Sequence, residues 1–260
     1  MDYKVIEGAE AFYMESGEIG IVLCHGFNGT PQSVREVGEM LRQKGFTVYA
    51  PRLNGHGTHY LDMEQYDYKD WLTSVKEAIS FLQKNCTQVY VAGQSMGGSI
   101  ALHCAASLPA IDGIITINAA LDIPCYEAEG NSKQRFIPEG KPDIKAQDVY
   151  EIAYDRVPRS AIKNLLALSK ETKSKLGMVT CPALIIKSKI DNVVPPRSSD
   201  IAFTRIASKP KKLITLKNSY HVATMDNDKG VIANEIAKFI TANSRGRAMN
   251  NQNPGKEHVR

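Results

Sequence analysis

The residues best suited to chemistry in this chain are a serine and the two glycines that flank it. The motif Gly-Gln-Ser-Met-Gly occupies residues 93–97 and places Ser95 at its centre. An apolar run at residues 89–92 precedes the motif, and small and apolar residues at 99–107 follow it. Between a strand and a helix, Gly-x-Ser-x-Gly forms a strained turn that exposes the serine, and the glycines leave room for that turn. The pattern predicts Ser95 as a nucleophile.

A serine nucleophile needs a histidine to take its proton and a carboxylate to orient that histidine. Where a serine sits on such a strand–helix turn, these partners follow it in the order acid, then histidine. Asp191 comes shortly after a predicted strand at residues 183–187, and His221 comes shortly after another at 213–216. Both lie past the carboxyl end of a strand, where open α/β sheets build their sites. We predict Asp191 as the orienting acid and His221 as the base.

Other acids and histidines fit the pattern less well. Asp226 and Asp228 follow His221 and precede a predicted helix, where an acid commonly acts as a cap. His25 competes as a base, but a histidine before a glycine more often shapes a loop than titrates.

Stabilisation of the oxyanion requires backbone N–H donors close to the nucleophile. A predicted strand at residues 20–24 runs into His-Gly-Phe-Asn-Gly-Thr at 25–30, a loop that can present such a donor. We predict the N–H of Phe27 as the first donor and the N–H of Met96, the residue after the nucleophile, as the second.

Predicted strands and helices alternate along the chain, which indicates an α/β fold with a parallel sheet between helices. The strands are expected at 20–24, 46–50, 89–92, 113–118, 183–187 and 213–216, and the helices at 31–43, 67–84, 99–107 and 231–242. The alternation breaks at residues 122–176, which predicts an insertion between two core segments, 1–121 and 177–243. Residues 244–260 are rich in Asn, Gly, Lys and Arg and are expected to be a disordered tail.

The chain resembles α/β-hydrolases of the bacterial monoacylglycerol lipase and carboxylesterase group, most of all the bacilli-type monoacylglycerol lipases. The shared segments are 25–31, 51–60, 93–98, 117–124, 181–184 and 218–224, and the likeness runs from about residue 6 to about residue 241. It implies an α/β-hydrolase fold with a mostly parallel central sheet and a small cap at 122–176. It also implies hydrolysis of monoacylglycerols to fatty acid and glycerol through a Ser-His-Asp triad and an acyl-enzyme, without a cofactor.

Two further residues are candidate substrate contacts. The resemblance places Glu151 near the mouth of the pocket, where its carboxylate could bind a glycerol headgroup; the alternative is a solvent-facing helix residue. Asn118 ends a predicted strand, so it could line the pocket or hydrogen-bond a neighbouring loop.

The triad alone leaves other substrates open. A broad short- to medium-chain carboxylesterase, a thioesterase and an acyltransferase would use the same three residues, since only the leaving group or acceptor differs. A ligand-binding protein built on this fold would be favoured by a broken triad, and all three positions are present here.

Composition excludes several other classes of protein. The chain has 260 residues, of which 43% are hydrophobic, and this suits one large domain. Its net charge of +4 is small, and the basic residues do not form a face that would bind nucleic acid. Five cysteines without a Cys-x-x-Cys favour neither a disulfide framework nor a metal site. Without a signal segment or about 18 consecutive apolar residues, a soluble cytoplasmic protein is expected. The expected partner is a small lipid ester, with transient contact between the cap and a lipid surface; no oligomeric state is predicted.

Overall fold

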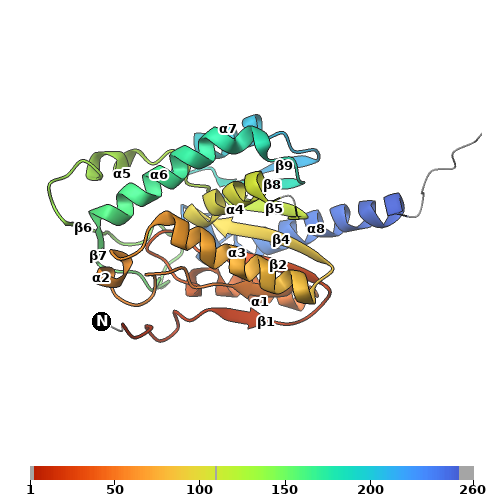
Figure 1. The fold of residues 1–260 in the computed structure, drawn as a ribbon, viewed down its shortest axis with the longest axis horizontal. Coiled ribbons are helices and arrows are strands. Elements are labelled where there is room, and N and C mark those ends of the chain that lie inside the picture. The colour runs from red at the N-terminus through yellow and green to blue at the C-terminus, as the bar shows by residue number, and fades with distance from the viewer. Residues whose placement is uncertain (1–2, 109, 252–260) are drawn as a thin grey trace, which may run out of the picture.

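The computed structural model describes residues 3–108 and 110–251, and its centre is a twisted, mostly parallel sheet (Figure 1). Within the described residues the sheet has seven strands in the order β1-β3-β2-β4-β5-β8-β9, and only β1 is antiparallel to its neighbour. Their bounds are β1 Phe12–Met14, β2 Ile19–Cys24, β3 Thr47–Ala50, β4 Gln88–Gln94, β5 Gly113–Ile117, β8 Ala183–Ser188 and β9 Lys211–Leu216. The α/β-hydrolase architecture expected from the sequence is confirmed.

Helices cover both faces of the sheet, each over its own apolar core. On one face α1 (Gln32–Gln43) packs beside α8 (Lys229–Asn251). The other face carries α3 (Tyr68–Asn85), α4 (Met96–Ser107) and α7 (Arg197–Arg205). Because both faces are buried, the central strands are mostly apolar, as is usual in a parallel sheet, and the few buried polar residues in them include Gln94 and Thr116.

Helix α3 illustrates how local sequence sets an element near the site. The side chain of Asp67 accepts hydrogen bonds from the N–H groups of Lys69 and Asp70, and the side chain of Asp70 accepts one from the N–H of Asp67. This capping box starts the helix because it satisfies N–H groups that have no partner within it. The buried side of α3 is a stripe of apolar residues at helical spacing, Trp71, Leu72, Val75, Ala78, Ile79 and Leu82.

The segment between β5 and β8 contains α5 (Pro124–Glu129), β6 (Phe136–Pro138), β7 (Arg156–Pro158), α6 (Arg159–Lys175) and η1 (Leu176–Met178). Strands β6 and β7 pair antiparallel as a separate small sheet. Helix α6 packs on α4, and its apolar side joins the core above the sheet. Helix α6 therefore belongs to the hydrophobic core, because it contributes to the same apolar layer as α3 and α4. The described residues also include two short elements, α2 (Tyr60–Met63) and η2 (Ala223–Met225).

The tail expected at residues 244–260 lies partly outside the described residues. Helix α8 continues to Asn251, and residues 252–260 lie outside the described part. No proline occurs between Pro210 and Pro254, so nothing in the sequence removes a helical N–H before residue 251. In the described part of the chain, no helix combines the length and apolarity needed to cross a membrane.

Candidate active site

The nucleophile candidate sits on a tight turn between β4 and α4. Ser95 has φ 56° and ψ −117°, a conformation that L-residues rarely adopt and that costs on the order of 1–3 kcal/mol. A Cβ on Gly93 would lie 2.1 Å from the carbonyl carbon of Gly97, and a Cβ on Gly97 would lie 2.3 Å from the carbonyl oxygen of Cys24. Both contacts are with backbone, so only glycine fits at either position.

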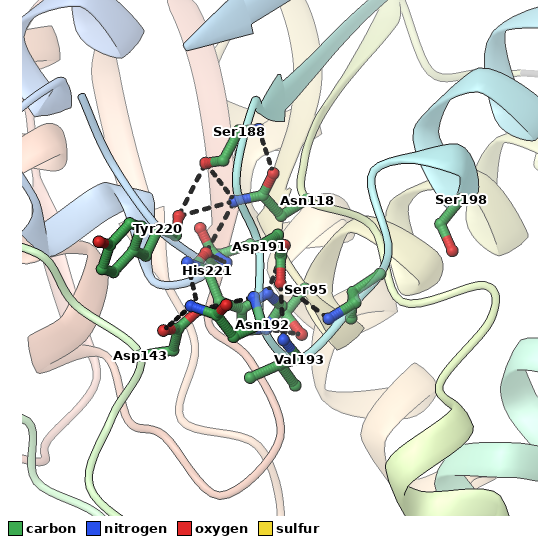
Figure 2. A network of polar contacts seen from close by, with 12 residues as sticks. Ser95, Asn118, Asp143, Ser188, Asp191, Asn192, Val193, Ser198, Tyr220 and His221 are labelled. Atoms are coloured by element: carbon green, nitrogen blue, oxygen red, sulfur yellow. Dashed lines mark hydrogen bonds and ion pairs between the residues drawn. The ribbon is translucent and has the colours of Figure 1, made fainter. Parts of the chain in front are cut away.

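The three predicted members of the triad meet in one hydrogen-bonded chain (Figure 2). His221 Nε2 lies 2.9 Å from Ser95 Oγ, and His221 Nδ1 lies 2.8 Å from Asp191 Oδ2. The other oxygen of Asp191 accepts the N–H groups of Val193 and Val194 at 3.0 and 2.7 Å. Because an ionised carboxylate only accepts, the proton of the imidazole belongs on Nδ1, and Nε2 is free to accept from the serine.

Asn118 has the second of its two expected roles. Its amide nitrogen donates to Ser188 Oγ at 3.0 Å and to the carbonyl of His221 at 2.8 Å, and its oxygen accepts the N–H of Ser188 at 2.7 Å. The side chain does not line the pocket. The amide nitrogen of Asn118 therefore holds the loop that carries His221, while its oxygen is bonded to Ser188 at the end of β8. A substrate contact by Asn118 stays a prediction.

The loop after β2 lies directly against the nucleophile. A Cβ on Gly26 would come 3.3 Å from Ser95 Cβ, so the backbone before Phe27 is packed on the serine. Among the described residues, the N–H groups of Phe27 and Met96 donate to no protein acceptor, which leaves both available to a ligand. His25 is buried and accepts the N–H of Leu53 at 3.2 Å. Burial lowers the pKa of His25 to about 4, so it braces this loop as a neutral ring.

A cavity of about 370 Å³ opens beside Ser95 and His221. Much of its wall comes from the segment between β5 and β8, including the apolar side chains Ile123, Ile137 and Leu165. Val193, Val194 and Val222 add apolar surface from the loops of the acid and the base. A cavity of this size that combines apolar walls with polar groups is typical of a small-ligand site.

Glu151 lies in this cavity, on a stretch of backbone that the side chain of Gln32 holds in place. Gln32 donates to the carbonyl of Tyr150 at 2.7 Å and accepts the N–H of Ile152 at 3.1 Å. A Cβ on Gly29 would lie 2.8 Å from Glu151 Oε1, so glycine there makes room for the carboxyl. Burial raises the pKa of Glu151 to about 7, and among the described residues its carboxyl has no hydrogen-bond partner. Its hydrogen-bonding capacity is therefore open to a ligand.

The cavity is lined by a second, partly buried carboxyl that the sequence did not indicate. Tyr126 donates its hydroxyl hydrogen to Glu139, 2.9 Å from either carboxyl oxygen. Burial raises the pKa of Glu139 to about 7. The Tyr126 ring meets the Phe27 ring edge-on, with centroids 5.6 Å apart. Tyr126 and Glu139 both lie in residues 125–145, where no motif marks a site. Only the folded insertion brings them together. In the described part of the chain, no group of His, Cys, Asp and Glu is arranged to hold a metal ion.

Comparison of the chain with known proteins identifies its family. A family profile described as "Serine aminopeptidase, S33" matches residues 18–228. The chain is 44% identical over 241 residues to the thermostable monoacylglycerol lipase of Bacillus sp. (strain H-257), covering 92% of this chain and 96% of that one. It is 24% identical over 238 residues to a carboxylesterase of Bacillus subtilis (strain 168), covering 88% and 95%.

Solved structures agree with these sequence relatives. One from a study of the metagenome-derived lipolytic enzymes LipS and LipT matches with a TM-score of 0.89 and 39% identity, over 92% of this chain and 100% of that one. The monoacylglycerol lipase of Paleococcus ferrophilus matches with a TM-score of 0.75 and 17% identity, over 94% and 100%, and so supports the fold alone. The chain therefore belongs to the serine hydrolase family described as serine aminopeptidase, S33, and has its α/β-hydrolase fold.

Proposed function

We propose that this hydrolase cleaves carboxylic esters with Ser95, His221 and Asp191. Ser95 Oγ attacks the ester carbonyl carbon while His221 Nε2 takes the hydroxyl proton. The oxyanion accepts hydrogen bonds from the N–H groups of Phe27 and Met96. The C–O bond to the alcohol breaks, and the alcohol leaves with the proton from His221. Water then repeats the sequence on the acyl-enzyme and releases the acid. The observation that carries this proposal is the unbroken hydrogen-bonded chain from Asp191 through His221 to Ser95.

Within the esters, we propose monoacylglycerols as the substrate. The apolar wall of the cavity suits a single acyl chain, and Glu151 provides a free polar group for the two hydroxyls of the glycerol headgroup. The relative from Bacillus sp. that is 44% identical is a monoacylglycerol lipase. Residues 122–176 then act as the cap, since they supply both the apolar wall and Glu151.

The substrate class is tested by steady-state hydrolysis of monoacylglycerols of increasing chain length. The same assay measures the hydrolysis of four comparison substrates: a diacylglycerol, an aryl ester, an acyl thioester and an aminoacyl amide. We expect the highest kcat/KM on monoacylglycerols and little turnover of the diacylglycerol, whose second chain has no place in a cavity of about 370 Å³. Preference for the aryl ester would support a broad carboxylesterase instead. Preference for the thioester or the amide would overturn the proposed substrate class while keeping the triad.

Glu151→Gln separates headgroup binding from catalysis. We expect KM for monoacylglycerols to rise about tenfold, since one charged or strong hydrogen-bonding partner is weakened, with little change on an aryl ester. The exposed Glu127→Gln, in the same insertion, is the matched control. Equal losses on both ester types would contradict a headgroup role for Glu151.

The same variant should change the pH dependence of stability. The folded protein keeps the proton of Glu151 up to a pKa of about 7, whereas a free glutamate releases it near 4.5. The folded state thus binds more protons between these values, and the free energy of unfolding falls as pH rises through this window. Glu151→Gln removes that loss, so it should be more stable than the wild type at pH 8 by up to about 3 kcal/mol, and near equal at pH 4. Denaturant unfolding at both pH values measures this; a variant less stable at pH 8 would contradict the buried placement.

A further inference from the structure

Asp143, from the insertion, joins the loop of the catalytic acid to the loop of the catalytic base. Its Oδ2 accepts the N–H of His221 at 3.1 Å and the N–H of Asn192 at 3.0 Å, and its Oδ1 accepts the side-chain amide of Asn192 at 2.7 Å. Its carbonyl oxygen accepts the N–H of Val222 at 3.1 Å. Figure 2 shows Asp143 beside His221 and Asn192, next to the triad.

These hydrogen bonds reach both loops whose separation sets the distance between Asp191 and His221. Asn192 directly follows Asp191 in the chain, while the second bond is made to His221 itself. Asp191 and His221 stand on different loops, after β8 and after β9, and their side chains meet at 2.8 Å. A single carboxylate that accepts from both loops fixes how far apart they stand.

The neighbouring residues of the insertion anchor Asp143 on the same side. The N–H groups of Lys145 and Ala146 donate to the carboxylate of Asp226 at 2.8 and 3.0 Å. Asp226 also accepts the N–H of Tyr220 at 2.9 Å, so residues 143–146 are tied to the chain on both sides of His221. Among the described residues no Lys, Arg or His side chain forms an ion pair with Asp143. Neutral N–H groups stabilise its carboxylate, which suits a geometric role.

We propose that Asp143 is a positioning residue that holds Asp191 and His221 in register, so that the insertion completes the catalytic geometry as well as the pocket wall. The inference rests on the proposed triad. It differs from two other roles for the same side chain, which lines the cavity: a direct substrate contact, and an electrostatic effect of its negative charge on His221.

Three substitutions separate geometry from charge. Asp143→Ala removes every acceptor of the side chain and should lower kcat about 10- to 100-fold, because a displacement of about 1 Å can cost that much. Asp143→Asn loses the charge but keeps an oxygen for the two backbone N–H groups, and the amide of Asn192 can rotate to accept its new donor. It should stay within about threefold of the wild type. Asp143→Glu keeps the charge but moves the carboxylate by one carbon–carbon bond, and it should lose about tenfold or more in kcat.

The relative activities of Asp143→Asn and Asp143→Glu decide between the roles. Positioning predicts that Asn is tolerated and Glu is not, whereas an electrostatic role predicts the reverse. A substrate contact predicts a rise in KM that depends on the alcohol, while positioning predicts the same fold loss in kcat on a monoacylglycerol and on a small aryl ester. Two exposed residues of the same loop serve as controls, Gln147→Ala for truncation and Asp148→Asn for loss of charge. If Asp143→Ala fails to fold, the contrast between Asn and Glu still decides.

A readout without substrate completes the test. The proton shared between His221 Nδ1 and Asp191 gives a low-field NMR resonance, assigned by its loss in His221→Ala. We expect this resonance in the wild type and in Asp143→Asn, and its shift or broadening in Asp143→Glu. An unchanged resonance and kcat in Asp143→Glu would overturn the positioning role while leaving the proposed function intact. An inactive wild type, or a Ser95→Ala variant that remains active, would instead show that the proposed function itself has failed.

Discussion

Replacing Ser95 by alanine is expected to lower kcat for ester hydrolysis by about 10⁴- to 10⁶-fold, because the atom that forms the acyl-enzyme is removed. The fold should survive the change. Alanine keeps the Cβ, so the turn at φ 56° carries the same strain as with serine. The substitution removes the 2.9 Å hydrogen bond to His221 Nε2, and a small buried side chain becomes slightly smaller. The residual rate reflects substrate binding and the oxyanion donors, which are backbone groups and remain.

The matched control for Ser95 lies four residues later in the chain. Ser99, on helix α4, donates to the carbonyl of Ala120 at 2.8 Å, and the same carbonyl also accepts from Ser169 at 2.7 Å. Ser99→Ala therefore leaves that acceptor satisfied and should hydrolyse esters within a fewfold of the wild-type rate. Burst kinetics and thermal melting of both variants compare chemistry with folding. Turnover by a well-folded Ser95→Ala close to that of the wild type would refute the mechanism.

The sequence predicts the parts of this site whose signals are local. Ser95 is marked by its own glycines, and the structure shows that a Cβ at Gly93 or Gly97 would meet backbone at 2.1–2.3 Å. Asp191 and His221 are marked by position, since each follows a strand of a parallel sheet whose carboxyl ends gather at one edge. The signals for the strands are local too, and the expected strands agree with β2, β3, β4, β5, β8 and β9 to within one or two residues.

The parts that the sequence does not predict depend on contacts between distant segments. Asn118 reaches His221 across 103 positions, and Asp143 reaches it across 78. The sequence does not identify these partners, because most of them are backbone groups of distant segments, which no residue type marks. Burial has the same effect at Glu139, which resembles a solvent-facing acid until the insertion folds over it. The sequence also does not indicate strand β1 or helix α7, because one has three residues and the other begins directly after two prolines.

Asp191→Asn should lower kcat about 10⁴-fold with little change in the shape of the site. The reason lies in the surroundings of the carboxylate. Asp191 Oδ1 accepts the N–H groups of Val193 and Val194 at 3.0 and 2.7 Å, so an asparagine must place its oxygen there. Its NH₂ group then faces His221 Nδ1, 2.8 Å away in the wild type, and can only donate to it.

That donation reverses the tautomer of the histidine. With Nδ1 acting as an acceptor, the ring proton moves to Nε2, and Nε2 can no longer take the proton of Ser95. The loss should thus fall on kcat, while KM stays near its wild-type value because no atom that contacts substrate has changed. Asp122→Asn, which weakens a surface ion pair with Arg197, is the control for removing a carboxylate elsewhere. A folded Asp191→Asn with kcat within about tenfold of the wild type would show that the imidazole is oriented by other groups. Those groups would include Asn118 and Asp143, which hold the backbone of His221.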